Sequence, residues 1–263
     1  DISIVPSRRT RSSKDVSTAW QIDAYRFDMP ILNHPTDAIG SPAVAIEMGK
    51  LGALGVINAE GLWARHEDVE AEIAELADAA LSDPDPATAV RRLQELHAAP
   101  INLDRVAAAI AEVRAAGVTS AVRVSPQLAH ELTPALLEAG LEVLMVHGTI
   151  ISAEHVVLVD RGAEDLVAEP LNLKTFIADL DIPVIAGGVQ DHRTALHLMR
   201  TGAAGVIVGY GSTEGATTTG EVLGIGVPMA TAIADAAAAR RDYLDETGGR
   251  YVHVIADGDL HTS

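Results

Sequence analysis

Pro183-Val184-Ile185-Ala186-Gly187-Gly188 is a short apolar run that ends in two glycines, and a stretch with helical periodicity follows it. The next apolar run, Gly205-Val206-Ile207-Val208, begins after that stretch and ends at Gly209. Short continuous apolar strands that alternate with helices are typical of a parallel sheet covered on both faces. These segments therefore predict a repeating βα unit of an α/β protein.

The same pattern occurs along the whole chain. The predicted strands are Pro30–Asn33, Leu54–Asn58, Ser120–Val124, Glu142–Val146, Pro183–Ala186, Gly205–Val208 and Tyr251–Ala256. No G-x-G-x-x-G fingerprint follows the first strand, so a closed barrel is favoured over an open doubly wound sheet. The predicted fold class is a (β/α)8 TIM barrel. No eighth strand is recognisable in the sequence, and a barrel of seven strands would have an open edge with unpaired backbone groups. The barrel is therefore expected to be truncated before or within the eighth strand unit.

The 263 residues are predicted to form a single barrel domain, 1–263, with two additions. Residues 1–25 are rich in Arg, Ser and Asp and are expected to form an N-terminal arm or hairpin. Residues 65–116 contain more helix than one barrel unit needs, with helices expected over 67–81, 88–98 and 104–116. We interpret this segment as a helical elaboration of the second unit, and a separate domain is the alternative.

Composition restricts the partners and the chemistry. The net charge of −18 argues against nucleic acid or an anionic membrane as the main partner. A mononucleotide stays open, because backbone N–H groups can hold its phosphate. No apolar run reaches the ~18 residues of a membrane span and the start does not resemble a signal peptide, so a cytoplasmic location is expected. The sequence has no cysteine, which excludes disulfides and thiol catalysis.

The candidate site residues follow the predicted strands, because α/β barrels carry their active sites at the C-terminal strand ends. They are Asn33, His34, Thr36, Asp37, Asn58, Glu60, Ser125, Gln127, His147, Thr149, Gly187, Gly188, Asp257, Gly258 and Asp259. The Gly- and Thr-rich segment 209–220 is typical of a loop whose backbone approaches a ligand, and a flexible surface loop is the alternative.

Two histidines raise the question of a metal site. His34 and His147 follow different strands, and Asp37 or Glu60 could be carboxylate partners. No local signature such as H-x-x-x-H supports this arrangement, so hydrogen-bonded strand-end histidines are favoured and no metal is expected. A Ser–His–Asp triad has no better support, since no G-x-S-x-G elbow is present.

Six segments together match one known pattern in the right order across the chain. They are Asp1–Ser7, Pro30–Asp37, Leu51–Asn58, Thr201–Ser212, Glu221–Ala232 and Val254–Gly258. In these segments the chain resembles the IMP dehydrogenase/GMP reductase family. The chain is most similar to the IMP dehydrogenase-related paralogues without CBS domains, and the helical segment 65–116 lies where a CBS module would be. The resemblance implies an NAD(P)-dependent oxidoreductase of purine nucleotides that forms a homotetramer.

The resemblance also implies residue roles. For the substrate, IMP or GMP, it places Asp257 and Gly258 at the ribose hydroxyls and Gly211 and Ser212 by the base and phosphate. For NAD or NADP, the implied residues are His147, Gly148 and Thr149 at the nicotinamide nucleoside and Gly187 and Gly188 in the floor of the site. Thr218 aligns with a threonine close to the reacting base.

The chain departs from the family pattern at the reacting centre. The family attacks the purine with a cysteine thiolate, and that position falls at or beside Ala216. His147 replaces a usual aspartate, and Asp259 replaces the second glycine after the seventh strand. Impaired or altered catalysis is therefore expected. The alternatives are a non-catalytic purine-nucleotide-binding regulatory or assembly protein and, because Gly187 and Gly188 suit phosphate approach, a flavin-dependent barrel enzyme.

Overall fold

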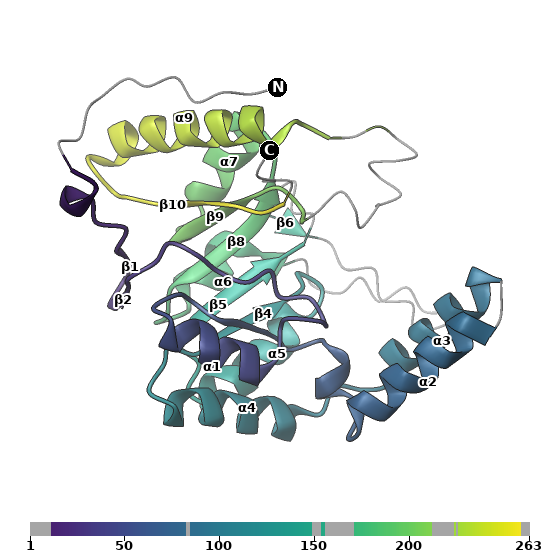
Figure 1. Ribbon diagram of the computed structural model, residues 1–263. Coiled ribbons are helices and arrows are strands. Elements are labelled where there is room, and N and C mark those ends of the chain that lie inside the picture. The colour runs from purple at the N-terminus through teal and green to yellow at the C-terminus, as the bar shows by residue number, and fades with distance from the viewer. Residues whose placement is uncertain are drawn as a thin grey trace.

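Six parallel strands form one sheet in the computed structural model, which describes residues 12–82, 85–148, 154–155, 171–211, 224 and 226–258. The order across the sheet is β10-β9-β8-β5-β4-β3 (Figure 1). The strands are β3 (Val56–Asn58), β4 (Ala121–Val124), β5 (Val143–His147), β8 (Val184–Val189), β9 (Gly205–Val208) and β10 (His253–Ala256). Six of the predicted strands are thus confirmed as members of one parallel sheet.

The first predicted strand, 30–33, is reduced to a single bridge. Leu32 pairs in parallel with Leu54, just before β3. The side-chain amide of Asn33 then donates to the Val56 carbonyl at 2.9 Å and accepts from the Val56 N–H at 2.7 Å. A side chain therefore occupies the backbone groups that a longer strand would use, and the prediction of a full strand is wrong.

Helices follow the strands and cover the outer face of the sheet (Figure 1). They are α1 (Pro42–Lys50), α4 (Leu103–Ala115), α5 (Ala129–Glu138), α6 (Leu173–Ala178), α7 (His192–Met199) and α9 (Met229–Thr247). Shorter elements are the 3-10 turns η1 (Ser13–Asp15) and η2 (Leu62–Ala64), and the antiparallel pair β6 (Glu154–His155) and β7 (Leu171–Asn172). Among the helices described, none is long and apolar enough to cross a membrane.

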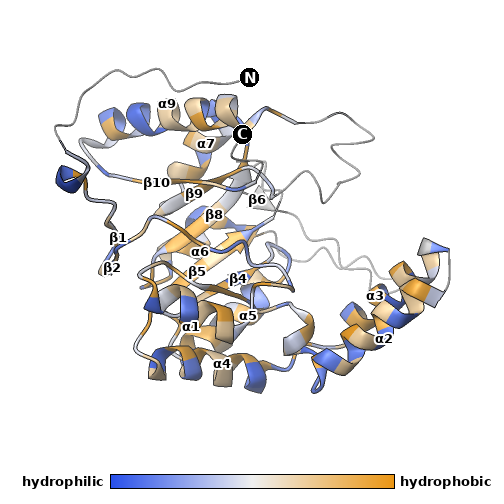
Figure 2. Cartoon of the chain, in the orientation of Figure 1, coloured by the Kyte–Doolittle hydropathy of each residue, from blue (hydrophilic) through white to orange (hydrophobic). Residues whose placement is uncertain are grey.

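Alternate residues of each strand face two different cores. On β5, Leu144 and Val146 pack with the covering helices, whereas Val143 and Met145 join a second cluster inside the barrel. Both faces of the strands are thus apolar, as the orange strands of Figure 2 show. Burial on both faces explains why the strands read as continuous apolar runs rather than alternating ones.

An antiparallel hairpin fills one end of the barrel interior. It consists of β1 (Trp20–Ile22) and β2 (Tyr25–Phe27), and its Ile22 and Phe27 belong to the inner cluster. The hairpin begins within the predicted N-terminal arm, 1–25, and ends two residues beyond it. The hairpin thus fills one end of the barrel with apolar side chains, and the polar residues that follow the strands lie at the opposite end.

The helical segment 65–116 divides into two parts. Helices α2 (Val69–Ser82) and α3 (Pro86–Ala98) form a hairpin that projects from the barrel (Figure 1). Helix α4, by contrast, lies beside α1 and α5 and buries Ile110 and Val113 in the outer core. The elaboration is therefore narrower than 65–116, because α4 is the covering helix of its own βα unit.

An opening remains between β10 and the bridge residue Leu32. A cavity of about 600 Å³ lies there, lined on one side by Ile31 and Leu32 and on the other by Val254 and Ile255. In the described part of the chain β10 pairs only with β9. The described residues form an α/β barrel of the (β/α)8 type, as the sequence predicts, with a gap among them at the eighth strand position.

Asp191 is expected to stabilise the protein by capping α7. Its Oδ1 accepts from the Thr194 N–H at 3.0 Å, and its Oδ2 accepts from the Thr194 hydroxyl at 2.7 Å. Burial alone would raise its pKa, but the hydrogen bonds from Thr194 outweigh burial and lower the pKa of Asp191 below 3.8. Asp191→Ala should cost about 1–2 kcal/mol in the free energy of unfolding at neutral pH.

The pH dependence of this loss has a definite sign. A carboxyl whose pKa is lowered in the folded state contributes fully above its unfolded pKa and loses that contribution as pH falls through the folded pKa. Denaturant unfolding should therefore show that the free energies of unfolding of the wild type and Asp191→Ala converge below pH 3.8. Asp191→Asn, which keeps the cap, should cost little. A loss that is equal at neutral and acidic pH would contradict this explanation.

Candidate functional site

Alternation along the strands brings polar side chains to the inside of the barrel at the C-terminal strand ends. On β5 the inner residues Val143 and Met145 are followed by His147. On the last strand the inner Ile255 is followed by Asp257, just after β10. His34 follows the inner residue Leu32. Three segments far apart in sequence therefore converge at one end of the barrel, where active sites of this fold lie.

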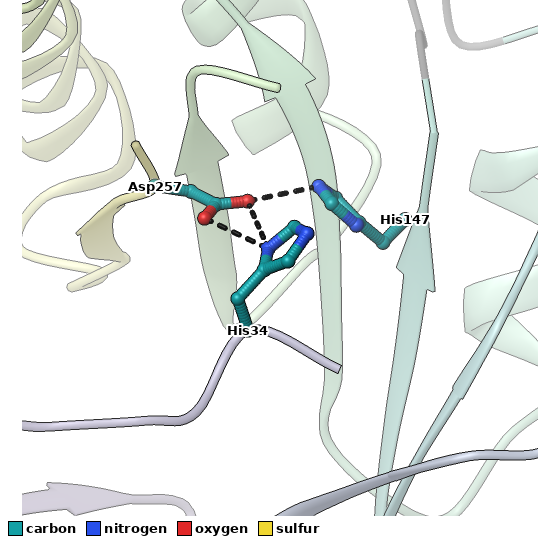
Figure 3. Close-up of side chains that lie close together, drawn as sticks. All are labelled: His34, His147 and Asp257. Atoms are coloured by element: carbon teal, nitrogen blue, oxygen red, sulfur yellow. Dashed lines mark hydrogen bonds and ion pairs between the residues drawn. The ribbon is translucent and has the colours of Figure 1, made fainter. Parts of the chain in front are cut away.

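His34, His147 and Asp257 form a close cluster, which we call the His–His–Asp cluster. Figure 3 shows both imidazoles pointing toward the carboxylate from different segments. His34 Nδ1 lies 2.9 Å from Oδ1 and 3.0 Å from Oδ2 of Asp257, and His147 Nε2 lies 3.2 Å from Oδ2. The two rings are nearly perpendicular, with centroids 5.4 Å apart.

The cluster is largely removed from solvent on one side. The side chains of His147 and Asp257 are 9% and 15% exposed, and that of His34 is 33% exposed. Burial raises the pKa of the Asp257 carboxyl, but contact with His147 and His34 outweighs burial and holds the pKa well below its usual range. Asp257 is therefore an anion at neutral pH.

A second group of residues positions His147. Arg123, on β4, donates to the His147 carbonyl at 3.0 Å and lies 3.6 Å from the Glu60 carboxylate. The same guanidinium donates to Asn58 Oδ1 at 3.4 Å, at the end of β3. Glu60 also accepts from the N–H of Ser125. These contacts link the ends of three neighbouring strands, so the backbone that carries His147 is held in place.

Glycines predicted for the cofactor meet at the ends of β5 and β8. The Gly148 N–H donates to the Gly187 carbonyl at 2.8 Å, and the Gly188 N–H donates to the Gly148 carbonyl at 2.5 Å. Gly211, predicted for the substrate, has φ +92°, and a Cβ there would lie 3.1 Å from His34 Cε1. Gly148, Gly187, Gly188 and Gly211 thus lie at the same end of the barrel as the His–His–Asp cluster, and Gly258 adjoins Asp257.

Five residues singled out from the sequence lie outside the described part of the chain. They are Thr149, Ser212, Ala216, Thr218 and Asp259. The suggested carboxylate partners of the histidines are corrected by the structure. Asp37 instead pairs with His97 at 3.0 Å and accepts from the Leu62 N–H, and Glu60 faces Arg123. Asp257 takes their place, because it follows the strand that borders the barrel opening opposite Leu32.

Sequence reasoning missed Arg123 as a site residue. A signal was available, since Arg123 is the one charged residue within the otherwise apolar run Ser120–Val124. A charged side chain in a buried strand needs polar partners. The sequence did not show which residues these partners are, because they come from the end of β3 and from β5.

The fold and the site define a class: a (β/α)8-type barrel with its polar residues at the C-terminal strand ends. The chain belongs to the IMP dehydrogenase/GMP reductase family, since the model of the IMP dehydrogenase / GMP reductase domain matches residues 1–263. An uncharacterized oxidoreductase of Mycobacterium tuberculosis is 72% identical over 263 residues, which cover all of this chain and 68% of that protein.

Two further comparisons agree with this family. An inosine-5'-monophosphate dehydrogenase of Pasteurella multocida is 36% identical over 133 residues, 51% of this chain and 23% of that protein. The crystal structure of an IMP dehydrogenase/GMP reductase-like protein from Corynebacterium glutamicum superposes with a TM-score of 0.84 at 57% identity. That comparison covers 98% of this chain and 65% of the other, so this chain spans about two thirds of the length of the Corynebacterium and Mycobacterium tuberculosis proteins.

Proposed function

We propose that the protein is an NAD(P)-dependent oxidoreductase of a purine mononucleotide, IMP or GMP, whose catalysis is altered because it has no cysteine nucleophile. The observation that carries this proposal is that a chain matching the family over its whole length contains no cysteine at all. A thiolate is the nucleophile of the chemistry that the resemblance implies, and an unactivated hydroxyl is a far poorer one. By the same resemblance, the protein forms a homotetramer; the cytoplasmic location stays a prediction from the sequence.

The site supports binding of a nucleotide ribose. Asp257 is ionised, and its carboxylate accepts hydrogen bonds at the C-terminal end of the barrel. Ionised acceptors make stronger hydrogen bonds to hydroxyl donors than neutral ones do. Gly211 and Gly258 beside it both have positive φ and no side chain, which lets a ligand approach the backbone closely.

The cofactor fits the described residues only in part. The cavity beside the His–His–Asp cluster has a volume of about 40 Å³ and is lined by Met145, Ile207 and Ile255 as well as the cluster. Ligand pockets typically measure about 300–1,000 Å³. This cavity alone is too small for a nucleotide, so we propose that the described residues contribute only one end of the site, and no step of hydride transfer is assigned to them.

The direct test is activity of the full-length protein. It is incubated with IMP and NAD, and separately with GMP and NADPH, while the absorbance of the reduced cofactor is followed. We expect turnover in one of the two assays, at a rate well below that of an enzyme with the cysteine. No change in either assay would refute the oxidoreductase proposal.

The missing cysteine also favours a second function, a non-catalytic nucleotide-binding protein that regulates or assembles with another. Calorimetry separates the two. Binding of IMP or GMP without turnover would support this second function, and absence of any purine-nucleotide binding would contradict both.

Asp257→Asn is expected to weaken the binding of the purine nucleotide by roughly 10–100-fold, because a charge-assisted hydrogen bond contributes about 1.5–3 kcal/mol. Isothermal titration calorimetry with the preferred nucleotide measures the effect. Asp242→Asn is the matched control, since Asp242 pairs with a histidine, His192, at 2.8 Å but lies on the exposed surface. Equal affinity of wild type and Asp257→Asn would contradict ribose recognition by this carboxylate.

A further inference from the structure

We propose that His34, His147 and Asp257 bind a divalent transition-metal ion, with Zn²⁺ the ion best matched to the ligands. The proposal goes beyond the proposed function and does not rest on it, because it requires no nucleotide and no redox cofactor. It rests on the arrangement of three side chains from three separate segments, whose candidate ligand atoms all lie within 4.8 Å of one another.

The distances around the carboxylate fit a metal. His34 Nδ1 and His147 Nε2 lie 3.0 Å and 3.2 Å from the same oxygen, Oδ2 of Asp257. Two ligands on a tetrahedral Zn²⁺ with bonds near 2.0 Å are about 3.3 Å apart. These two separations are therefore close to the edges of a zinc coordination tetrahedron, and the third pair of ligand atoms, the two ring nitrogens, lies within 4.8 Å.

A buried nitrogen in the cluster makes no satisfactory hydrogen bond. His147 Nε2 is inaccessible to solvent, and although it lies 3.2 Å from Asp257 Oδ2, it forms no well-aligned hydrogen bond within the described residues. The side chain is 9% exposed. An unsatisfied buried polar atom in a native protein calls for an explanation, and an ion is one. Coordination would give this nitrogen a partner that the carboxylate alone does not provide.

Neighbouring residues limit the space around the two segments that carry the imidazoles. The Arg123 guanidinium donates to the backbone carbonyl of His147 at 3.0 Å, so it restrains the backbone at this position. Beside the other ring, a Cβ on Gly211 would lie 3.1 Å from His34 Cε1, so a larger residue there would crowd the imidazole.

The ligand set indicates the class of ion. Two imidazoles and one carboxylate favour Zn²⁺ or another first-row transition metal over Mg²⁺ and Ca²⁺, which prefer oxygen ligands alone. Three protein ligands leave a fourth position open, as in zinc sites that bind water or substrate. One carboxylate and two neutral imidazoles leave the bound ion with a net charge of about +1, which a chain of net charge −18 attracts.

The test titrates full-length protein, stripped with a chelator, with Zn²⁺ and no nucleotide. We expect one tightly bound ion per chain, and loss of one ligand in His34→Gln or His147→Gln should weaken binding by at least about 100-fold, since even outer contacts are worth 10–100-fold. His192→Gln is the control, because His192 pairs with Asp242 at 2.8 Å on the surface. It should leave the affinity unchanged.

X-ray absorption of the wild-type protein loaded with Zn²⁺ gives an independent reading that needs no variant to fold. Two imidazole ligands and oxygen in the first shell would support the proposal. Fewer than two imidazoles, or unchanged Zn²⁺ affinity in a folded His34→Gln variant, would overturn it. A protein that binds Zn²⁺ but shows no oxidoreductase activity would refute the proposed function alone, and the reverse result would refute this site alone.

Discussion

Leu144→Ala is expected to lower the free energy of unfolding by about 2–5 kcal/mol, the largest stability effect that we expect from a single substitution. Leu144 lies on β5 in the centre of the sheet, is 0% exposed, and belongs to the core between sheet and helices. Strands β4 and β8 flank it on both sides. Truncation therefore leaves a cavity that the neighbouring strands cannot collapse to fill.

Equilibrium unfolding in denaturant measures this loss. Leu137→Ala is the matched control, because Leu137 has the same side chain but is 37% exposed on α5. Surface substitutions usually change stability by no more than about 0.5 kcal/mol. If the two variants lost the same free energy, the central position of β5 in the core would be wrong.

Arg123→Met is expected to cost about 2–3 kcal/mol, less than the 3–5 kcal/mol of a fully buried pair because both partners keep some contact with water. The side chains of Arg123 and Glu60 are 20% and 16% exposed. Removal of the guanidinium leaves the Glu60 carboxylate without its ion pair and the His147 carbonyl without its donor. The substitution should therefore lower the stability of the protein and also loosen the backbone that carries His147 into the His–His–Asp cluster.

A double-mutant cycle separates the loss of the ion pair with Glu60 from the loss of the hydrogen bond to the His147 carbonyl. Glu60→Gln removes the unpaired charge, so the double variant should recover part of the stability lost in Arg123→Met. Arg200→Gln is a control, since its pair with Glu246 is on the surface and contributes little. Simple additivity of Arg123→Met and Glu60→Gln would contradict the coupling between the two side chains.

The residues of the site could be predicted from the sequence, but their contacts with one another could not. Strand ends are readable from the sequence, so His34, His147 and Asp257 were all among the candidates. Their association was not readable, because β3 and β4 separate Leu32 from β5 along the sheet, and Asp257 comes from across the barrel opening. Asp37 and Glu60 are closer in sequence to His34, but in the structure they pair with His97 and Arg123.

The parallel α/β class can be read from the order of residues alone, because strands buried on both faces must be apolar at successive positions. For the same reason the sequence did not show which of Leu144 and Met145 faces the helices and which faces the barrel interior. Tertiary structure decided that, by pairing β5 in register with β4 and β8. That register also turned Arg123 and His147 inward, and the curling of the sheet into an incomplete barrel brought Asp257 to His34 across the opening. Contacts between distant segments depend on this curling, which local periodicity does not encode.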